Sequence, residues 1–161
     1  MKCTTLQDAI DRYGPIENGV WADEAKWMTV IPIPADISAT WLNTNNNNQP
    51  TIHIYGNKDM TDALLAALDA VRAAGIIDQL KTFDGCFNIR PVRGMNSIST
   101  HAYGLGIDMN AADYPLGSDA RMSDELVACF KNAGFDYGGD FVSRKDAMHI
   151  SYAFEVPGGS S

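Results

Sequence analysis

The residues of this chain best suited to chemistry are two histidines and two aspartates in two short segments. The first segment reads Ser99-Thr-His-Ala-Tyr-Gly-Leu-Gly-Ile-Asp108, and the second reads Asp146-Ala-Met-His149. Two imidazoles and one carboxylate are the usual protein ligands of a hydrolytic zinc ion, which keeps its fourth position open for water. A remaining carboxylate can then act as the general base on that water. The pattern therefore indicates a hydrolytic metal site.

The local sequence suggests how these side chains could meet. Two glycines lie between His101 and Asp108, so one continuous helix is unfavourable there. Apolar and polar positions alternate in residues 106–110, which predicts a strand with Asp108 on its polar face. The same alternation in residues 148–154 predicts a strand with His149 on its polar face. If the two strands pair, a histidine from the loop and one side chain from each strand converge. Each residue alone is more typical of a surface, turn or structural position, and only the joint pattern favours a metal site.

The remaining sequence favours an α+β fold with a small antiparallel β-sheet and flanking helices. No repeat or composition shift marks a domain boundary, so we expect one domain over residues 1–161. Residues 1–45 would form an N-terminal extension packed on it, and residues 156–161 a frayed tail. Periodicity and turn residues predict helices at 5–13, 60–74 and 123–132, strands at 29–34, 51–55 and 87–92, and a polar loop at 43–49.

Composition excludes several classes of protein. The chain is 45% hydrophobic and has a net charge of −8, which argues against a nucleic-acid binder and against adsorption to anionic membranes by charge. No apolar run is long enough to span a bilayer, and no signal peptide is evident at the N-terminus. Cys3, Cys86 and Cys129 are widely spaced without a CxxC pair, which favours reduced thiols over a disulfide framework.

The two segments resemble the signatures of a known enzyme family. Ser99-x-His-x-x-Gly-x-x-x-Asp108 and Asp146-x-Met-His149 are similar to the motifs of the D-alanyl-D-alanine carboxypeptidase and L-alanyl-D-glutamate endopeptidase zinc enzymes. These peptidoglycan peptidases share a fold with lysostaphin and the hedgehog signalling domain, and the resemblance implies a zinc site in a cleft on the sheet. Further segments resemble the phage endolysin branch: Gly85-Cys-Phe-Asn-x-Arg90, Gly134-Phe135 and Gly138-Gly-Asp-Phe141. The resemblance covers about residues 50–154 and, more weakly, residues 27–34.

The resemblance implies a role for each candidate residue. His101, Asp108 and His149 would hold one Zn²⁺ ion, and Asp146 would be the catalytic base, at a position where relatives often have glutamate. Arg90 would stabilise the oxyanion, with Arg93 as the alternative.

Ser99 would orient the metal ligands or the substrate, and Tyr103 and Tyr137 would contact the substrate. The alternatives are a turn hydroxyl for the serine and ordinary packing for the tyrosines. Relatives often have tryptophan at position 137. Gly104 and Gly106 would let the loop pass close to the metal, and Gly138-Gly139 would let a peptide approach the backbone. The alternative is that all four are turn residues.

The implied function is cleavage of the stem peptide of bacterial peptidoglycan, between L-Ala and D-Glu, by a phage endolysin in host lysis. Such a monomer would be made in the host cytoplasm without a signal peptide or membrane insertion, and a membrane-permeabilising holin would let it reach the periplasm and cell wall. A D-alanyl-D-alanine carboxypeptidase is the alternative within the same class. A non-catalytic peptidoglycan-binding module is the alternative from another class.

Overall fold

The chain is built from small sheets and short helices. The structure is a computed structural model that describes residues 2–90, 98–142 and 144–153. Its largest sheet has six strands in the order β5 (Gln49–Pro50), β4 (Leu42–Asn43), β7 (Thr82–Gly85), β8 (Gly106–Met109), β10 (His149–Ser151) and β9 (Asp136–Tyr137). All neighbouring strands in it are antiparallel except β4 and β7. The prediction of a mixed fold with helices and small sheets is confirmed, but the largest sheet is not purely antiparallel as expected, because β4 and β7 run parallel.

Two smaller sheets and several helices complete the described residues. One sheet pairs β3 (Met28–Pro32) with β6 (His53–Asn57), and the other pairs β1 (Ile16–Glu17) with β2 (Val20–Trp21). The α-helices are α1 (Leu6–Tyr13), α2 (Glu24–Trp27), α3 (Ala35–Ser38), α4 (Thr61–Ala73) and α5 (Asp124–Lys131). Short 3₁₀ helices are η1 (Lys58–Met60), η2 (Ile77–Gln79), η3 (Thr100–Tyr103) and η4 (Gly138–Asp140). Within the described residues, every helix is too short or too polar to cross a membrane.

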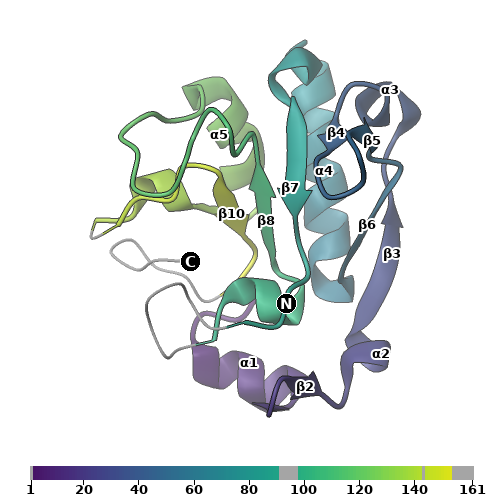
Figure 1. Ribbon diagram of the computed structural model, residues 1–161, viewed down its shortest axis with the longest axis vertical. Coiled ribbons are helices and arrows are strands. Elements are labelled where there is room, and N and C mark those ends of the chain that lie inside the picture. The colour runs from purple at the N-terminus through teal and green to yellow at the C-terminus, as the bar shows by residue number, and fades with distance from the viewer. Residues whose placement is uncertain (1, 91–97, 143, 154–161) are drawn as a thin grey trace.

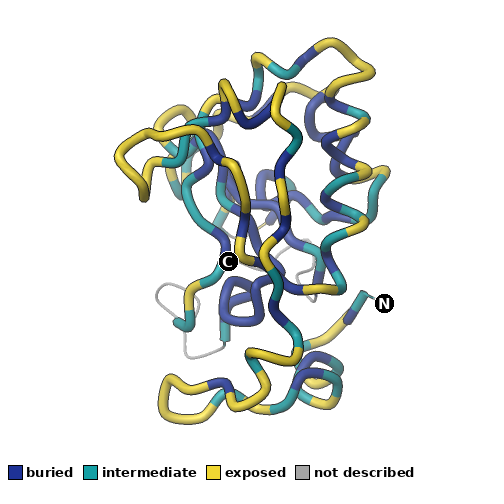
Figure 2. Tube along the Cα trace, turned by 90° about the vertical axis from the view of Figure 1, so that its right-hand side faces the viewer, coloured by how far each residue is buried: buried dark blue, intermediate teal, exposed yellow. Residues whose placement is uncertain are grey.

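The core forms where α4 and α5 pack against each other behind β7 and β8 (Figure 1). In α4, the side chains of Leu64, Leu68 and Val71 repeat at helical spacing and are fully buried. Gly75 ends this helix at φ +71°, and the amides of Gly75 and Ile76 bond back to its last turn. Figure 2 shows the buried stretches of chain running through the centre of the molecule, with exposed turns at its ends.

One predicted strand is wrong. The strand expected at residues 87–92 is replaced by β7, which ends at Gly85, where φ is +136° and the register with β8 shifts. The amide of Asn88 then donates to the carbonyl of His101, so this segment supports the motif loop instead of pairing in the sheet. Residues 91 and 92 lie outside the described residues. The loop predicted at 43–49 is the turn between β4 and β5, with Asn47 and Asn48 at positive φ.

The other predicted elements are present with shifted ends. Thr5 caps α1 in a reciprocal capping box with Asp8, and Ser123 caps α5 by accepting the amide of Leu126. The strand expected at 148–154 is β10 over three residues, and residue 154 lies outside the described chain. All three cysteines are buried and free.

The carboxylate of Asp59 binds two residues of the N-terminal helix α1. Arg12 donates to Asp59 through Nε at 2.6 Å and Nη2 at 3.0 Å, and the Tyr13 hydroxyl donates to Asp59 at 2.7 Å. Desolvation acts to raise the pKa of Asp59, but the hydrogen bonds from Arg12 and Tyr13 lower it overall. Because the folded-state pKa is lowered, the stabilisation is present above about pH 4 and is lost as the pH falls through the folded pKa.

We therefore expect Asp59→Asn to lower the free energy of unfolding at pH 7 by about 1–3 kcal/mol, the range for hydrogen bonds to a charged group. Urea denaturation of both proteins measures this difference, which should narrow as the pH falls below about 4. Asp119→Asn is the control, because the Asp119 side chain is 97% exposed and its loss should change stability by less than about 0.5 kcal/mol. An equal effect of Asp59→Asn on the free energy of unfolding at pH 7 and below about pH 4 would contradict a stabilising role of the ionised carboxylate.

Candidate metal centre

The pairing of β8 with β10 brings two of the candidate ligands together. His149 lies directly opposite Asp108 in this antiparallel pair. Directly opposed residues project to the same face of a sheet, and here Nδ1 of His149 is 3.0 Å from Oδ1 of Asp108. His149 is fully buried, while the Asp108 side chain is 13% exposed. The sheet register therefore supplies an imidazole and a carboxylate in contact.

The third candidate ligand comes from η3, immediately before β8. Ser99 caps this turn, since its hydroxyl accepts the amide of His101 at 3.2 Å, and Gly104 ends it in the left-handed region at φ +68°. The turn places Nε2 of His101 3.3 Å from Oδ1 of Asp108. One ligand atom from each of His101, Asp108 and His149 lies within 4.8 Å of the others. The three predicted ligands thus converge from three points in the chain.

The hydrogen bonds of His101 suit a metal ligand. Its Nδ1 is 2.7 Å from the carbonyl oxygen of Cys86, which can only accept, so Nδ1 carries the ring proton and Nε2 presents its lone pair. Nε2 is buried and has no hydrogen-bond partner among the described residues. A backbone carbonyl that fixes the tautomer in this way is a common partner of a metal-bound histidine. Two nitrogens and one carboxylate oxygen are the donor set expected for a catalytic zinc ion.

The carboxylate at the centre of the cluster is held in its ionised form. Desolvation acts to raise the pKa of Asp108, but the adjacent imidazoles of His101 and His149 lower it to well below its ordinary value. Two imidazole rings with their centroids 4.9 Å apart therefore flank an anion in a largely buried setting. Such a cluster favours a cation between its three donor atoms.

Gly106 leaves the space that the two imidazoles occupy. A Cβ at this position would lie 2.7 Å from Cε1 of His149 and 3.3 Å from Cε1 of His101. A methyl group would therefore displace both rings. The prediction that this glycine allows close approach at the metal site is consistent with the contact geometry.

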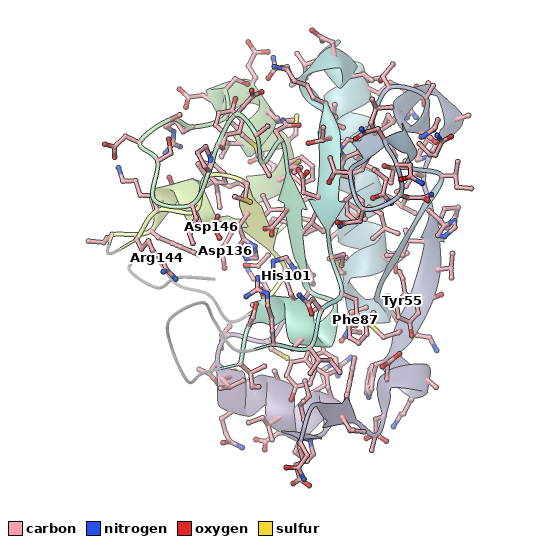
Figure 3. All side chains as sticks on the ribbon, in the orientation of Figure 1. Tyr55, Phe87, His101, Asp136, Arg144 and Asp146 are labelled. Atoms are coloured by element: carbon pink, nitrogen blue, oxygen red, sulfur yellow. The ribbon has the colours of Figure 1, made fainter. Side chains whose placement is uncertain are left out.

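Asp146 lies at the entrance to β10. Its carbonyl accepts the amide of His149 at 3.0 Å, and its own amide donates to the carbonyl of Gly138 at 2.9 Å. Asp146 is only 4% exposed. Figure 3 shows Asp146 on the segment leading into β10, and His101 below it on η3, the short helix that precedes β8. A Cβ on Gly138 would overlap the backbone oxygen of Asp146, so this glycine accommodates the Asp146 turn and not a bound peptide.

A cavity of about 240 Å³ opens beside the cluster, and its lining includes His101, Asp108 and Arg90. The expected oxyanion arginine therefore shares a cavity with two of the ligands. The alternative, Arg93, lies outside the described residues. Ser99 is fully buried and caps η3. This is the role of a turn hydroxyl, the alternative to a contact with substrate.

The two tyrosines expected at the substrate are packing residues in this structure. Tyr103 is 1% exposed, donates its hydroxyl to the carbonyl of Gly14 at 2.8 Å, and meets the Trp21 ring edge-on at 5.1 Å. Tyr137 is 2% exposed and donates its hydroxyl to the carbonyl of Ala147 at 2.8 Å. Neither belongs to the lining of the cavity beside the cluster. The structure favours the packing alternative for both.

Two supports of the site had no signal in the sequence. The carbonyl of Cys86 orients His101, and a backbone group leaves no trace in residue type. Asn57 is fully buried at the end of β6 and binds the end of η3, through its Nδ2 to the carbonyl of Tyr103 at 3.0 Å and through its amide to the carbonyl of Gly104 at 2.9 Å. These contacts connect the motif loop to the smaller sheet.

We expect His101→Ala to weaken zinc binding by at least about 100-fold, which exceeds the usual effect of losing an outer-shell partner. Competition with a chromophoric chelator measures the affinity, and metal analysis of the dialysed protein gives the stoichiometry. His53→Ala is the matched control, because His53 is exposed on β6 outside the cluster, and it should bind one equivalent with unchanged affinity. Equal zinc affinity in the two variants would show that the metal binds elsewhere.

Comparison with known proteins agrees with this geometry. Residues 93–152 match a family model described as D-alanyl-D-alanine carboxypeptidase. No curated protein and no solved structure gives a significant match, so the relation to the lysostaphin and hedgehog fold stays a prediction. The matched segment contains all three members of the His101, Asp108 and His149 cluster as well as Asp146, but not Arg90. The match and the cluster together support assignment of this segment to a zinc peptidase family.

Proposed function

We propose that this protein is a zinc peptidase that cleaves the stem peptide of bacterial peptidoglycan between L-Ala and D-Glu. The observation that carries the proposal is the convergence of His101, Asp108 and His149 beside an open cavity, within a segment that matches a peptidase family model. Three protein ligands and an accessible fourth side are the arrangement of a hydrolytic zinc site, whereas structural zinc sites are closed by four protein ligands.

The proposed chemistry divides between the metal and the chain. Zinc bound by the three ligands would lower the pKa of a bound water and polarise the scissile carbonyl. The carboxylate of Asp146 takes the proton from the attacking water and delivers it to the nitrogen of the leaving amine. Asp146 lies three residues before His149, and its carbonyl accepts the amide of His149, so both residues belong to the same turn into β10.

Arg90 is assigned to the developing negative charge on the carbonyl oxygen. It lines the same cavity as His101 and Asp108, and it contributes a permanent positive charge. Loss of one such donor typically lowers turnover about 10²–10³-fold. The cavity also contains the carboxylate of Asp84, which accepts hydrogen bonds from Thr44 and Thr82 at 2.8 Å and is thereby held at the rim.

The choice of bond rests on the residues around the motifs. The segments that resemble phage endolysins favour the L-Ala–D-Glu endopeptidase and a role in host lysis. A D-alanyl-D-alanine carboxypeptidase is the second candidate, favoured by the description of the matching family model. The cluster supplies three metal ligands and leaves a fourth position open, and Asp146 precedes the ligand His149 in the same turn. This combination argues against a non-catalytic peptidoglycan-binding module.

The proposed biological setting follows from the endolysin assignment. The protein would be made in the host cytoplasm, pass the inner membrane with the help of a holin, and act as a monomer on the wall in the periplasm. The net charge of −8 disfavours nucleic acid as a partner.

Mass spectrometry of purified Gram-negative peptidoglycan tests the proposal. With zinc-loaded protein we expect peptides carrying a new amino terminus on D-Glu, and no such products after chelation. Loss of single D-Ala residues would instead establish the carboxypeptidase. Absence of any metal-dependent product would contradict both.

The role of Asp146 is tested separately by comparing Asp146→Asn with the unaltered protein. Turnover should fall by about 10²–10⁴-fold, the usual contribution of a general base, while zinc affinity stays within about threefold because Asp146 is not a ligand. His101→Ala should lose both turnover and zinc affinity. Full activity of Asp146→Asn would refute the assignment of the base.

A further inference from the structure

A second cavity adjoins the one beside the metal ligands. Its volume is about 290 Å³, and it extends over the exposed face of β6, where Tyr55 is 38% exposed. The two cavities share four lining residues: Asn45, Gly85, Cys86 and Phe87. The two cavities therefore adjoin at these residues, and we refer to them together as the groove from the ligand cluster to β6. Figure 3 shows Phe87 between Tyr55 and His101, in agreement with this order.

The two ends of the groove differ in charge. The end at the metal ligands is lined by the charged residues Asp84, Arg90 and Asp108. The lining of the β6 end contains no carboxylate, lysine or arginine among the described residues. It consists of aromatic, amide and apolar groups together with the imidazole of His53 and the thiol of Cys86. A charged peptide suits the first end, whereas a neutral polar ligand suits the second.

The aromatic rings at the β6 end are held in place. The Tyr55 hydroxyl donates to the carboxylate of Glu24 at 2.8 Å, and the Tyr55 and Phe87 rings meet edge-on at 5.5 Å with 80° between their planes. A ring fixed in this way offers a flat apolar surface at little cost in side-chain entropy.

Amide side chains lie at the same end. The side-chain oxygen of Asn43 accepts the backbone amide of Asn45, and Nδ2 of Asn45 donates to the carbonyl of Asp84 at 3.0 Å. These bonds hold Asn43 at the β6 end and Asn45 at the junction of the two cavities. An aromatic surface bordered by amides matches the chemistry of a neutral sugar, which has apolar C–H faces and hydroxyl or N-acetyl groups at its edge.

We propose that this end of the groove binds a saccharide unit of the glycan strand while the stem peptide lies at the metal ligands. The inference rests on the proposed function and makes it more specific. The L-Ala–D-Glu bond lies next to the sugar, and the D-Ala–D-Ala bond lies at the far end of the peptide. Because an extended residue spans at most about 3.6 Å, the first bond can sit at the metal with the peptide extended while the sugar fills the adjoining cavity, whereas the far bond would require the intervening peptide to fold back. A sugar site here therefore favours the endopeptidase.

Binding of an N-acetylglucosamine tetrasaccharide, which has no peptide, tests the inference. Titration of the zinc-loaded protein, followed by amide NMR shifts, should give saturable binding that persists after chelation. Tyr55→Ala should weaken it about tenfold, and Asn45→Ala severalfold. Ile52→Ala is the matched control, because Ile52 is 63% exposed just before β6 and lies outside both cavities.

The possible outcomes distinguish the saccharide site from the peptidase activity. If the unaltered protein releases peptides from peptidoglycan but does not bind the tetrasaccharide, or binds it equally well as Tyr55→Ala, the inference is overturned and the peptidase remains. If the tetrasaccharide binds through Tyr55 and Asn45 but no metal-dependent peptide release occurs, the proposed peptidase is overturned and the sugar site remains. An equal loss of binding in Ile52→Ala would also overturn the site.

Discussion

His149 stands opposite Asp108 because β8 and β10 pair in one register, and the candidate site depends on that register. Side chains alternate along a strand, so a slip of one residue would turn the imidazole away from the carboxylate and into the core. Both strands are short, but the apolar side chains of Ile107 and Ile150 are buried on their other face and penalise a slip. Core packing thus determines the geometry of a polar cluster on the opposite face. Gly106 completes it by leaving room for the rings.

The third ligand is positioned by groups far from it in sequence. The carbonyl of Cys86 fixes the ring of His101, and Asn57 holds the end of η3 from the smaller sheet. The Tyr103 hydroxyl adds a bond to Gly14, which links the same turn to the N-terminal residues. Burying two imidazoles and a carboxylate is costly unless each is paired, and a bound divalent cation would satisfy all three lone pairs together. The fold therefore holds in place a cluster whose polar groups a metal ion would complete.

Sequence periodicity predicted the helices at 60–74 and 123–132 and the two ligand-bearing strands, because apolar spacing and capping residues are local signals. It failed at residues 87–92, although apolar and polar residues alternate there. The amide of Asn88 donates to the carbonyl of His101 in the motif loop, so this segment does not pair in the sheet. The ligand triad was predictable because the chain has only three histidines and the spacing of two of them from Asp108 and Asp146 is distinctive. The roles of Tyr103 and Tyr137 were not, since an aromatic residue near a motif has the same sequence signal in a core as in a cleft. The groove toward Tyr55 joins segments distant in sequence, and no local pattern marks it.

X-ray absorption spectroscopy of the zinc-loaded protein tests the central claim most directly, because it reports the atoms bound to the metal. The account predicts a shell of nitrogen and oxygen only, at about 2.0–2.2 Å, with the outer scattering of two imidazoles and no sulfur. Binding of zinc through the buried thiols of Cys3, Cys86 or Cys129 would add sulfur at about 2.3 Å. A sulfur contribution, or a shell with scattering from fewer than two imidazoles, would contradict a site made by His101, Asp108 and His149.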